Sequence, residues 1–115
     1  MSPTMSRGRS EPPALQEHAV EPVAGLDALA SALRTLRTQD EVTRFLRDLC
    51  TLPELEALAH RWQTVRLLDE GVSYVEIAEL VPTSTATVTR VAQWLRHGTG
   101  GYRLALDRIK RKGLA

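Results

Sequence analysis

Three short segments of this 115-residue sequence share one pattern, a threonine or serine followed three positions later by a glutamate. They are Thr38-Gln-Asp-Glu41, Thr51-Leu-Pro-Glu54 and Ser73-Tyr-Val-Glu76. In such a capping box the hydroxyl accepts a free backbone N–H of the first helical turn, and the glutamate reaches back to the cap residue. Three helix starts so close together, with no segment of strand-like alternation, predict an all-α fold of short helices.

Apolar residues at three- and four-residue intervals mark one face of each predicted helix. These stripes are Leu26, Leu29, Leu33, Leu36; Val42, Phe45, Leu46, Leu49; Leu55, Leu58, Trp62, Val65; and Tyr74, Ile77, Ala78, Val81. Gly71 is a typical C-cap, and Pro82 ends the fourth helix. Residues 97–101, "HGTGG", separate a further helix from a last basic one at about 102–112.

Residues 1–25 differ from the rest of the chain, because they mix Pro, Ser, Glu and Arg without periodicity. That composition predicts a disordered tail. Residues 26–115 are therefore expected to form one domain. A helical domain of about 85 residues has a limited core of its own, which favours a homodimer that shares helices.

Several classes of protein and site are disfavoured by the sequence. No apolar run reaches the roughly 18 residues that cross a bilayer, and no signal peptide is visible, so a cytoplasmic protein without membrane contact is expected. The single cysteine, Cys50, excludes an internal disulfide framework. His60 and His97 stand 37 positions apart without Cys or paired carboxylates at ligand spacing, so no metal site is expected. No catalytic constellation is visible, and the chain is not expected to be an enzyme.

Charge is unevenly distributed along the chain although the net charge is only +1. Residues 1–60 contain 6 basic and 9 acidic side chains, whereas residues 61–115 contain 9 basic and 5 acidic ones. Between Ser84 and Lys112 the ratio is 7 basic to 1 acidic. Such clustering is typical of proteins that bind a polyanion, although a solvated basic tail would look the same.

Two short helices joined by "VPTS", residues 81–84, have the form of a helix-turn-helix. In that motif the second helix enters the major groove and its first residues face the base edges. On a helical wheel Val88, Val91, Ala92 and Leu95 fall together, whereas Ala86, Thr89, Arg90 and Gln93 fall on the opposite side. We therefore expect Ser84, Thr85, Ala86 and Thr89 to face DNA, with Arg90 supplying charge to the backbone. Short hydroxyl side chains at the front of the helix favour readout by water and DNA shape.

Four segments resemble the Trp repressor family: "EALAHRWQTVRLLDEG", "SYVEIAEL", "TATVTRV" and "GTGGYRLALDRIK". The last is similar more specifically to the Trp-repressor-like YerC/YecD branch. The resemblance covers about Leu26 to Lys112 and implies an intertwined all-α homodimer that binds double-stranded DNA through a helix-turn-helix in each subunit. It adds Thr87 to the expected DNA-facing residues. It also places Val75 and Ala78 where the family repressor has basic, DNA-facing side chains.

A small-molecule site is also implied by the resemblance. The positions that hold the corepressor tryptophan in the family correspond to Thr51, Arg61 and Arg90. Val91 and Trp94 stand where the repressor has a glycine and a serine, and Trp94 would fill space that an indole occupies. We therefore expect no tryptophan cofactor, and a corepressor of unknown identity stays an alternative to no ligand at all.

Together these observations predict a homodimeric, sequence-specific DNA-binding transcriptional regulator, with repression by steric exclusion as the mechanism. Two other hypotheses remain open. One is a helical protein-interaction adaptor that keeps the fold. The other is an RNA-binding module that uses the basic last helix.

Overall fold

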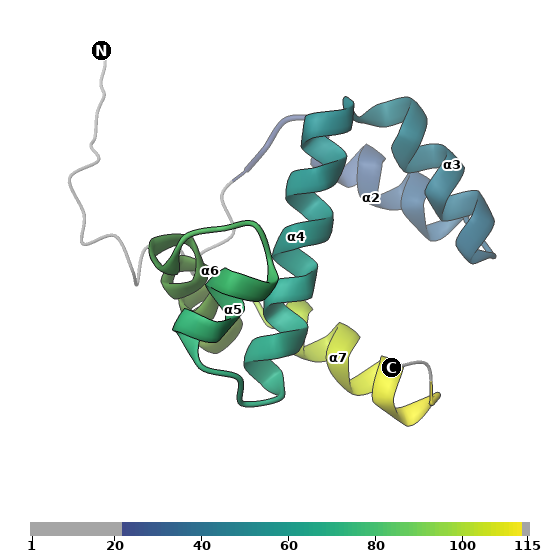
Figure 1. Cartoon of the computed structure of the whole chain (residues 1–115). Helices are drawn as coiled ribbons and strands as arrows, with labels where there is room; N and C mark the ends of the chain where they lie inside the picture. Colours follow the sequence, from purple (N-terminus) through teal and green to yellow (C-terminus); the bar gives the residue numbers. More distant parts are fainter. Residues whose placement is uncertain (1–21, 114–115) are drawn as a thin grey trace, which may run out of the picture. The chain divides into compact units, whose positions relative to one another are not determined.

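Six α-helices make up all the regular structure in the computed structural model, which describes residues 22–113 (Figure 1). They are α2 (Leu26–Arg34), α3 (Gln39–Leu49), α4 (Leu52–Asp69), α5 (Tyr74–Leu80), α6 (Thr85–His97) and α7 (Gly101–Arg111). The predicted all-α fold is confirmed, and each helix begins within one residue of its expected start. Of the predicted tail, residues 1–21 lie outside the described part of the chain. None of the helices between residues 22 and 113 has the length and apolarity that a membrane span requires.

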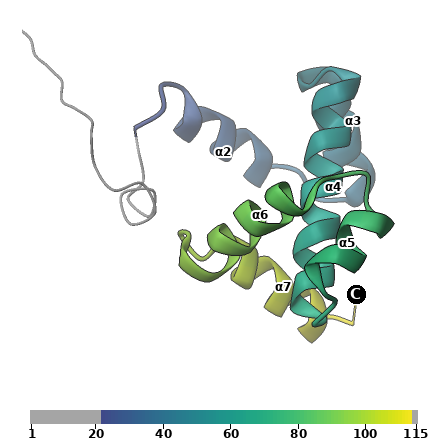
Figure 2. The same cartoon turned by 60° about the vertical axis from the view of Figure 1, so that its left-hand side comes forward.

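The chain divides within α6 into two compact parts. The first part is Pro22–Val91, with α2 to α5 and the first half of α6. Within it, α4 contacts both α3 and α5, as both views of the chain show (Figures 1 and 2). The second part contains the end of α6 and α7.

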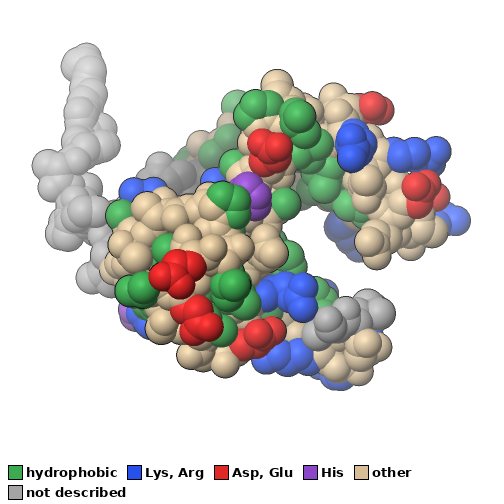
Figure 3. Space-filling model, in the orientation of Figure 1, with side chains coloured by type: hydrophobic (Ala, Val, Ile, Leu, Met, Phe, Trp, Pro, Cys, Tyr) green, Lys and Arg blue, Asp and Glu red, His purple; other side chains and the backbone are tan. Residues whose placement is uncertain are grey.

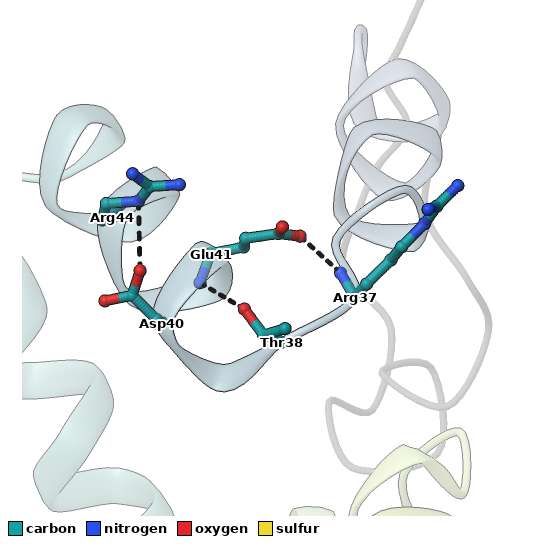
Figure 4. A network of polar contacts seen from close by, with 5 residues as sticks. All are labelled: Arg37, Thr38, Asp40, Glu41 and Arg44. Carbon is teal, nitrogen blue, oxygen red and sulfur yellow. Dashed lines mark hydrogen bonds and ion pairs between the residues drawn. The ribbon is translucent and has the colours of Figure 1, made fainter.

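The cap of α3 differs from the predicted box in one hydrogen bond (Figure 4). Thr38 Oγ1 accepts the backbone N–H of Glu41 at 3.1 Å, as expected. The Glu41 carboxylate, however, accepts the backbone N–H of Arg37 at 2.8 Å and not that of Thr38. The predicted reciprocal bond is therefore wrong here. Thr38 has φ −125°, against −70° at the complete box of Thr51, and φ sets the direction of the residue's own N–H.

The cap of α4 is a complete capping box, as predicted. The Thr51 hydroxyl accepts the N–H of Glu54, and Glu54 Oε1 accepts the N–H of Thr51 at 2.8 Å. Pro53 stands in the first turn, where its missing N–H has no partner to lose. The 18-residue helix that follows is the longest of those described.

The turn after α4 is a Schellman motif built on Gly71. Gly71 has φ +86°, a left-handed conformation that is unfavourable for residues with a Cβ. Its N–H donates to Leu68 O at 3.0 Å, and the N–H of Val72 donates to Leu67 O at 3.1 Å. These bonds satisfy two carbonyls of the last turn and direct the chain into α5, where Ser73 accepts the N–H of Glu76 at 3.2 Å.

The core that positions the helix-turn-helix consists of three side chains with no exposed surface, Ile77, Val81 and Val88. Around them pack half-buried residues of α4, α5 and the intervening turn: Leu67, Leu68, Val72, Tyr74 and Ala78. Each fully buried aliphatic side chain stabilises the fold by about 1.5–3 kcal/mol relative to an exposed one. This cluster fixes α5 against α4 and against the first turn of α6.

Candidate nucleic-acid interface

Ser84 caps α6, the helix that the sequence predicts to enter a DNA groove. Its Oγ accepts the N–H of Thr87 at 3.1 Å, and its carbonyl accepts the N–H of Val88 at 3.0 Å. The Ser84 hydroxyl also donates to Thr87 Oγ1 at 3.2 Å. Sequence reasoning missed this cap, because a threonine and not a glutamate stands three residues after the serine. The spacing Ser84-x-x-Thr87 was the available signal.

The outer surface of α6 contains most of the residues predicted to face DNA. Ser84, Thr85, Ala86, Thr89 and Arg90 are exposed, whereas Thr87 is half-buried. On the opposite side Val88, Val91 and Ala92 are buried, as expected, and Leu95 is half-buried. The packing of α6 therefore exposes the predicted DNA-facing residues to solvent, with the exception of Thr87.

Electrostatically, the start of α6 suits an anion. The helix contains no acidic residue from Thr85 to His97. The N-terminus of a helix has a partial positive charge and free N–H groups, which favour phosphate. Arg90, the sixth residue of the helix, adds a full positive charge. These features permit contact with a nucleic-acid backbone, although they do not select a sequence.

The exposed face of α5 has a different character, as Figure 3 shows, with acidic and hydrophobic side chains side by side over this helix. Val75 is 62% exposed and Leu80 is 59% exposed, with Glu76 and Glu79 on the same face. Of the two positions where the family repressor is basic, Val75 is therefore open to solvent. Ala78 is half-buried and packs against the Ile77 cluster, as its place in the predicted apolar stripe implies.

A cavity of about 340 Å³ lies between α4 and the segment that begins α6. Its polar lining comes from Glu56, His60, Arg61, Thr64, Thr83 and Thr87. Thr64 is almost fully buried, and its hydroxyl donates to His60 O at 2.9 Å. The three-four spacing of Ala57, His60, Arg61 and Thr64 along α4 could have revealed this polar face from the sequence.

Of the three predicted ligand-binding residues, Arg61 alone lines this cavity. Thr51 uses its hydroxyl in the cap of α4, and Arg90 is exposed on α6. Val91 belongs to the buried face of α6. The structure therefore does not assemble Thr51, Arg61 and Arg90 around one cavity of the described chain. Residues 22–113 also contain no group of three His, Cys, Asp or Glu side chains that could hold a metal ion.

Trp94 lines a different cavity, of about 190 Å³, together with Thr99, Gly100, Gly101 and Tyr102. Its ring packs over Gly98, where an added Cβ would lie only 3.0 Å from Trp94 Cε3 and would collide with the Trp94 carbonyl. Gly98 is thus required by this close approach. The tryptophan ring is part of the packing at the end of α6.

The chain is similar in sequence and in fold to proteins of the Trp repressor family. The sequence profile of the Trp repressor protein family matches residues 24–110. The uncharacterised protein YerC of Bacillus subtilis (strain 168) is 41% identical over 85 residues, which are 74% of this chain and 82% of YerC. The crystal structure of a TrpR-like protein from Eubacterium eligens ATCC 27750 superposes with a TM-score of 0.71 at 33% identity, covering 76% of this chain and 91% of that one. A "putative Trp repressor" from Staphylococcus aureus gives a TM-score of 0.71 at 36% identity, with 77% and 89% covered.

Proposed function

Because this chain belongs to the Trp repressor family, whose proteins are regulators and not enzymes, we propose that it is a DNA-binding transcriptional regulator acting as a homodimer. The observation that carries the proposal is the orientation of α6. Its apolar side is held by the Ile77, Val81 and Val88 cluster, and its acid-free side is open to solvent. A helix fixed from behind and exposed in front is what insertion into a major groove requires.

The proposed contacts follow from the exposed residues at the start of α6. Thr85, Ala86 and Thr89 bring methyl groups to the base edges, where thymine presents a methyl. Ser84 and the free N–H groups of the first turn contact phosphate, with Thr87 supporting the cap behind them. Arg90 supplies a positive charge to the same groove. Bound at a promoter, such a protein represses by excluding polymerase, and we propose that it does so in the cytoplasm.

The homodimer is supported by apolar surface that a single chain leaves uncovered. Neither α2 nor α3 contains a buried residue, although both have the predicted apolar stripes. Leucines on four helices are between 38% and 63% exposed: Leu26, Leu33, Leu49, Leu52, Leu58 and Leu104. We propose that residues 26–115 form one domain and that a second copy covers these leucines. Two copies of α6 would then address half-sites about 34 Å apart.

A small ligand is an optional part of the proposal. The cavity lined by Arg61 also touches Thr87, so a molecule bound there would contact α4 and the first turn of α6 together. Such a ligand would influence DNA binding by holding or displacing α6. Since Thr51 and Arg90 do not line the cavity, tryptophan is not proposed as that ligand.

The first test is whether purified protein retains specific fragments from sheared genomic DNA, followed by affinity measurements on a recovered fragment at several salt concentrations. Phosphate contacts make the affinity fall linearly with salt on logarithmic scales. Thr85→Glu should abolish binding, because it places a carboxylate against phosphates. Gln39→Glu is the matched control, since it adds the same charge at an exposed position of α3. No fragment above background, or equal affinity of both variants, would contradict the proposal, and tighter binding to structured RNA would favour the RNA-binding alternative.

One observation favours a second function, that of a protein-interaction adaptor. The face of α5 formed by Val75, Glu76, Glu79 and Leu80 is apolar and acidic, and carboxylates repel a phosphate backbone. In the adaptor, this face would contact another protein and α6 would not contact DNA. If the protein is an adaptor, it should retain no specific DNA fragment. There would then be no specific affinity that falls as the salt concentration rises.

A further inference from the structure

We infer that Arg90 and Gln93 are the base-reading residues of this protein, with Arg90 recognising guanine and Gln93 recognising adenine. This inference rests on the proposed DNA-binding function. It goes beyond that function because it assigns base identity to two side chains and gives Arg90 a role other than charge or ligand binding.

Arg90 and Gln93 both lie on the outer side of α6. The spacing of four exposed residues places them on one side of the helix. They are Ala86, Thr89, Arg90 and Gln93. This strip lies opposite the buried Val88, Val91 and Ala92. Arg90 does not line the cavity that contains Arg61, so it belongs to the outer surface. Whatever contacts the front of α6 therefore meets Arg90 and Gln93.

The hydrogen-bonding groups on the outer side of α6 differ in whether they already have a partner within the protein. The Ser84 hydroxyl donates to Thr87 Oγ1, and the Thr89 hydroxyl donates to Thr85 O at 2.9 Å. These two donors are already used within the helix. Among the described residues, neither the Arg90 guanidinium nor the Gln93 amide makes an internal hydrogen bond or ion pair. Arg90 and Gln93 are the long polar side chains of the strip. Their N–H donors, and the Gln93 carbonyl acceptor, are therefore available to another molecule.

The side chains of Arg90 and Gln93 are chemically complementary to two different bases. The planar fork of arginine fits O6 and N7 of guanine, and the glutamine amide fits N6 and N7 of adenine. Residues three apart on a helix are about 4.5 Å apart along its axis, close to the roughly 3.4 Å between successive base pairs. Arg90 and Gln93 can therefore address neighbouring base pairs. Ala86 and Thr89, earlier on the strip, offer methyl groups to thymines.

The experiment selects preferred duplexes from a randomised library with wild-type protein and with three variants, and then measures the affinity for single-base changes. Arg90→Lys keeps the charge but removes the fork. It should keep the wild-type salt dependence and lose preference for one guanine in each half-site, by roughly 5- to 150-fold. Gln93→Ala should lose preference for an adjacent adenine. Gln93→Glu should change that preference toward cytosine, whose amino group donates to a carboxylate.

The controls distinguish this inference from the proposed function. Gln63→Ala removes an exposed amide from α4 and should select the wild-type sequence. Circular dichroism should show wild-type melting for every variant, since the altered side chains are exposed. If the variants select wild-type sequences, or if Arg90→Lys weakens all duplexes equally, the base assignment is overturned while DNA binding stands. If wild-type protein selects no sequence, both the proposed function and the assignment fail.

Discussion

The hydroxyl oxygen of Ser84 lies 3.1 Å from the backbone nitrogen of Thr87 and 3.2 Å from the hydroxyl oxygen of the same residue. One side chain thus accepts the N–H of Thr87 and donates to its hydroxyl. Both contacts fix the first turn of α6, whose outer side is exposed at Thr85 and Ala86. The residue at the edge of the proposed DNA contact is therefore also the residue that starts the helix.

Replacing Ser84 separates these two roles. Ser84→Ala removes the cap and should lower the free energy of unfolding by about 1 kcal/mol. Ser84→Asp keeps a good cap, so its thermal midpoint should stay near that of the wild type, but its carboxylate should repel phosphate and reduce DNA affinity. Thermal unfolding and DNA titration of both variants provide the measurement. Tight DNA binding by Ser84→Asp would argue against the proposed docking.

Replacing Gly71 tests the turn between α4 and α5. Gly71→Ala should destabilise the protein by about 1–2 kcal/mol, because its φ of +86° is unfavourable for a residue with a Cβ. Gly101→Ala is the matched control, since Gly101 has no positive φ and no atom within 4 Å of an added Cβ. That change should be neutral or stabilise by about 0.4–1 kcal/mol. Chemical denaturation at one protein concentration compares the two, and equal effects would contradict the role of the left-handed turn.

Truncation of Ile77 tests the core behind α6. Ile77→Ala should cost about 2–5 kcal/mol, because the side chain is fully buried between α4, α5 and α6. Val75→Ala, two positions away on the exposed face of α5, should change stability by less than about 0.5 kcal/mol. Urea unfolding followed by circular dichroism measures both. A large effect at Val75 would show that this face is covered in solution.

Replacing exposed leucines tests the proposed homodimer. Leu33→Ser on α2 should weaken self-association, because burial of each leucine contributes about 1.5–3 kcal/mol and a two-fold interface contains the residue twice. Leu80→Ser makes the same change at a more exposed position of α5, outside the proposed interface. Sedimentation over a range of concentrations should show a weaker dimer for Leu33→Ser alone. A wild-type protein that sediments as a monomer at micromolar concentration would remove the dimer from the proposal.

Much of the local structure could be predicted because it depends on residues close together in sequence. The box at Thr51, the serine cap at Ser73, the stop at Gly71 and the apolar side of α6 all involve partners within about one helical turn. At Thr38 and at Ser73 the structure gives only the half of the predicted box in which the hydroxyl accepts the glutamate N–H. At Thr38, where φ differs from that of Thr51, the Glu41 carboxylate accepts the backbone N–H of Arg37 instead.

By itself, the sequence determined the all-α class, the helix starts and most of the outward-facing residues of α6, because hydrophobic periodicity and capping are local properties. The tertiary structure alone decided which of the equivalent-looking side chains meet. It placed Arg61 in a cavity with Thr64 and Thr87 and left Arg90 on the outer surface. Those outcomes depend on how each helix is rotated against its neighbours. That rotation is set by the packing of Ile77 and Val81, in α5 and at its C-cap, against Val88 of α6, a contact between two segments that no local pattern predicts.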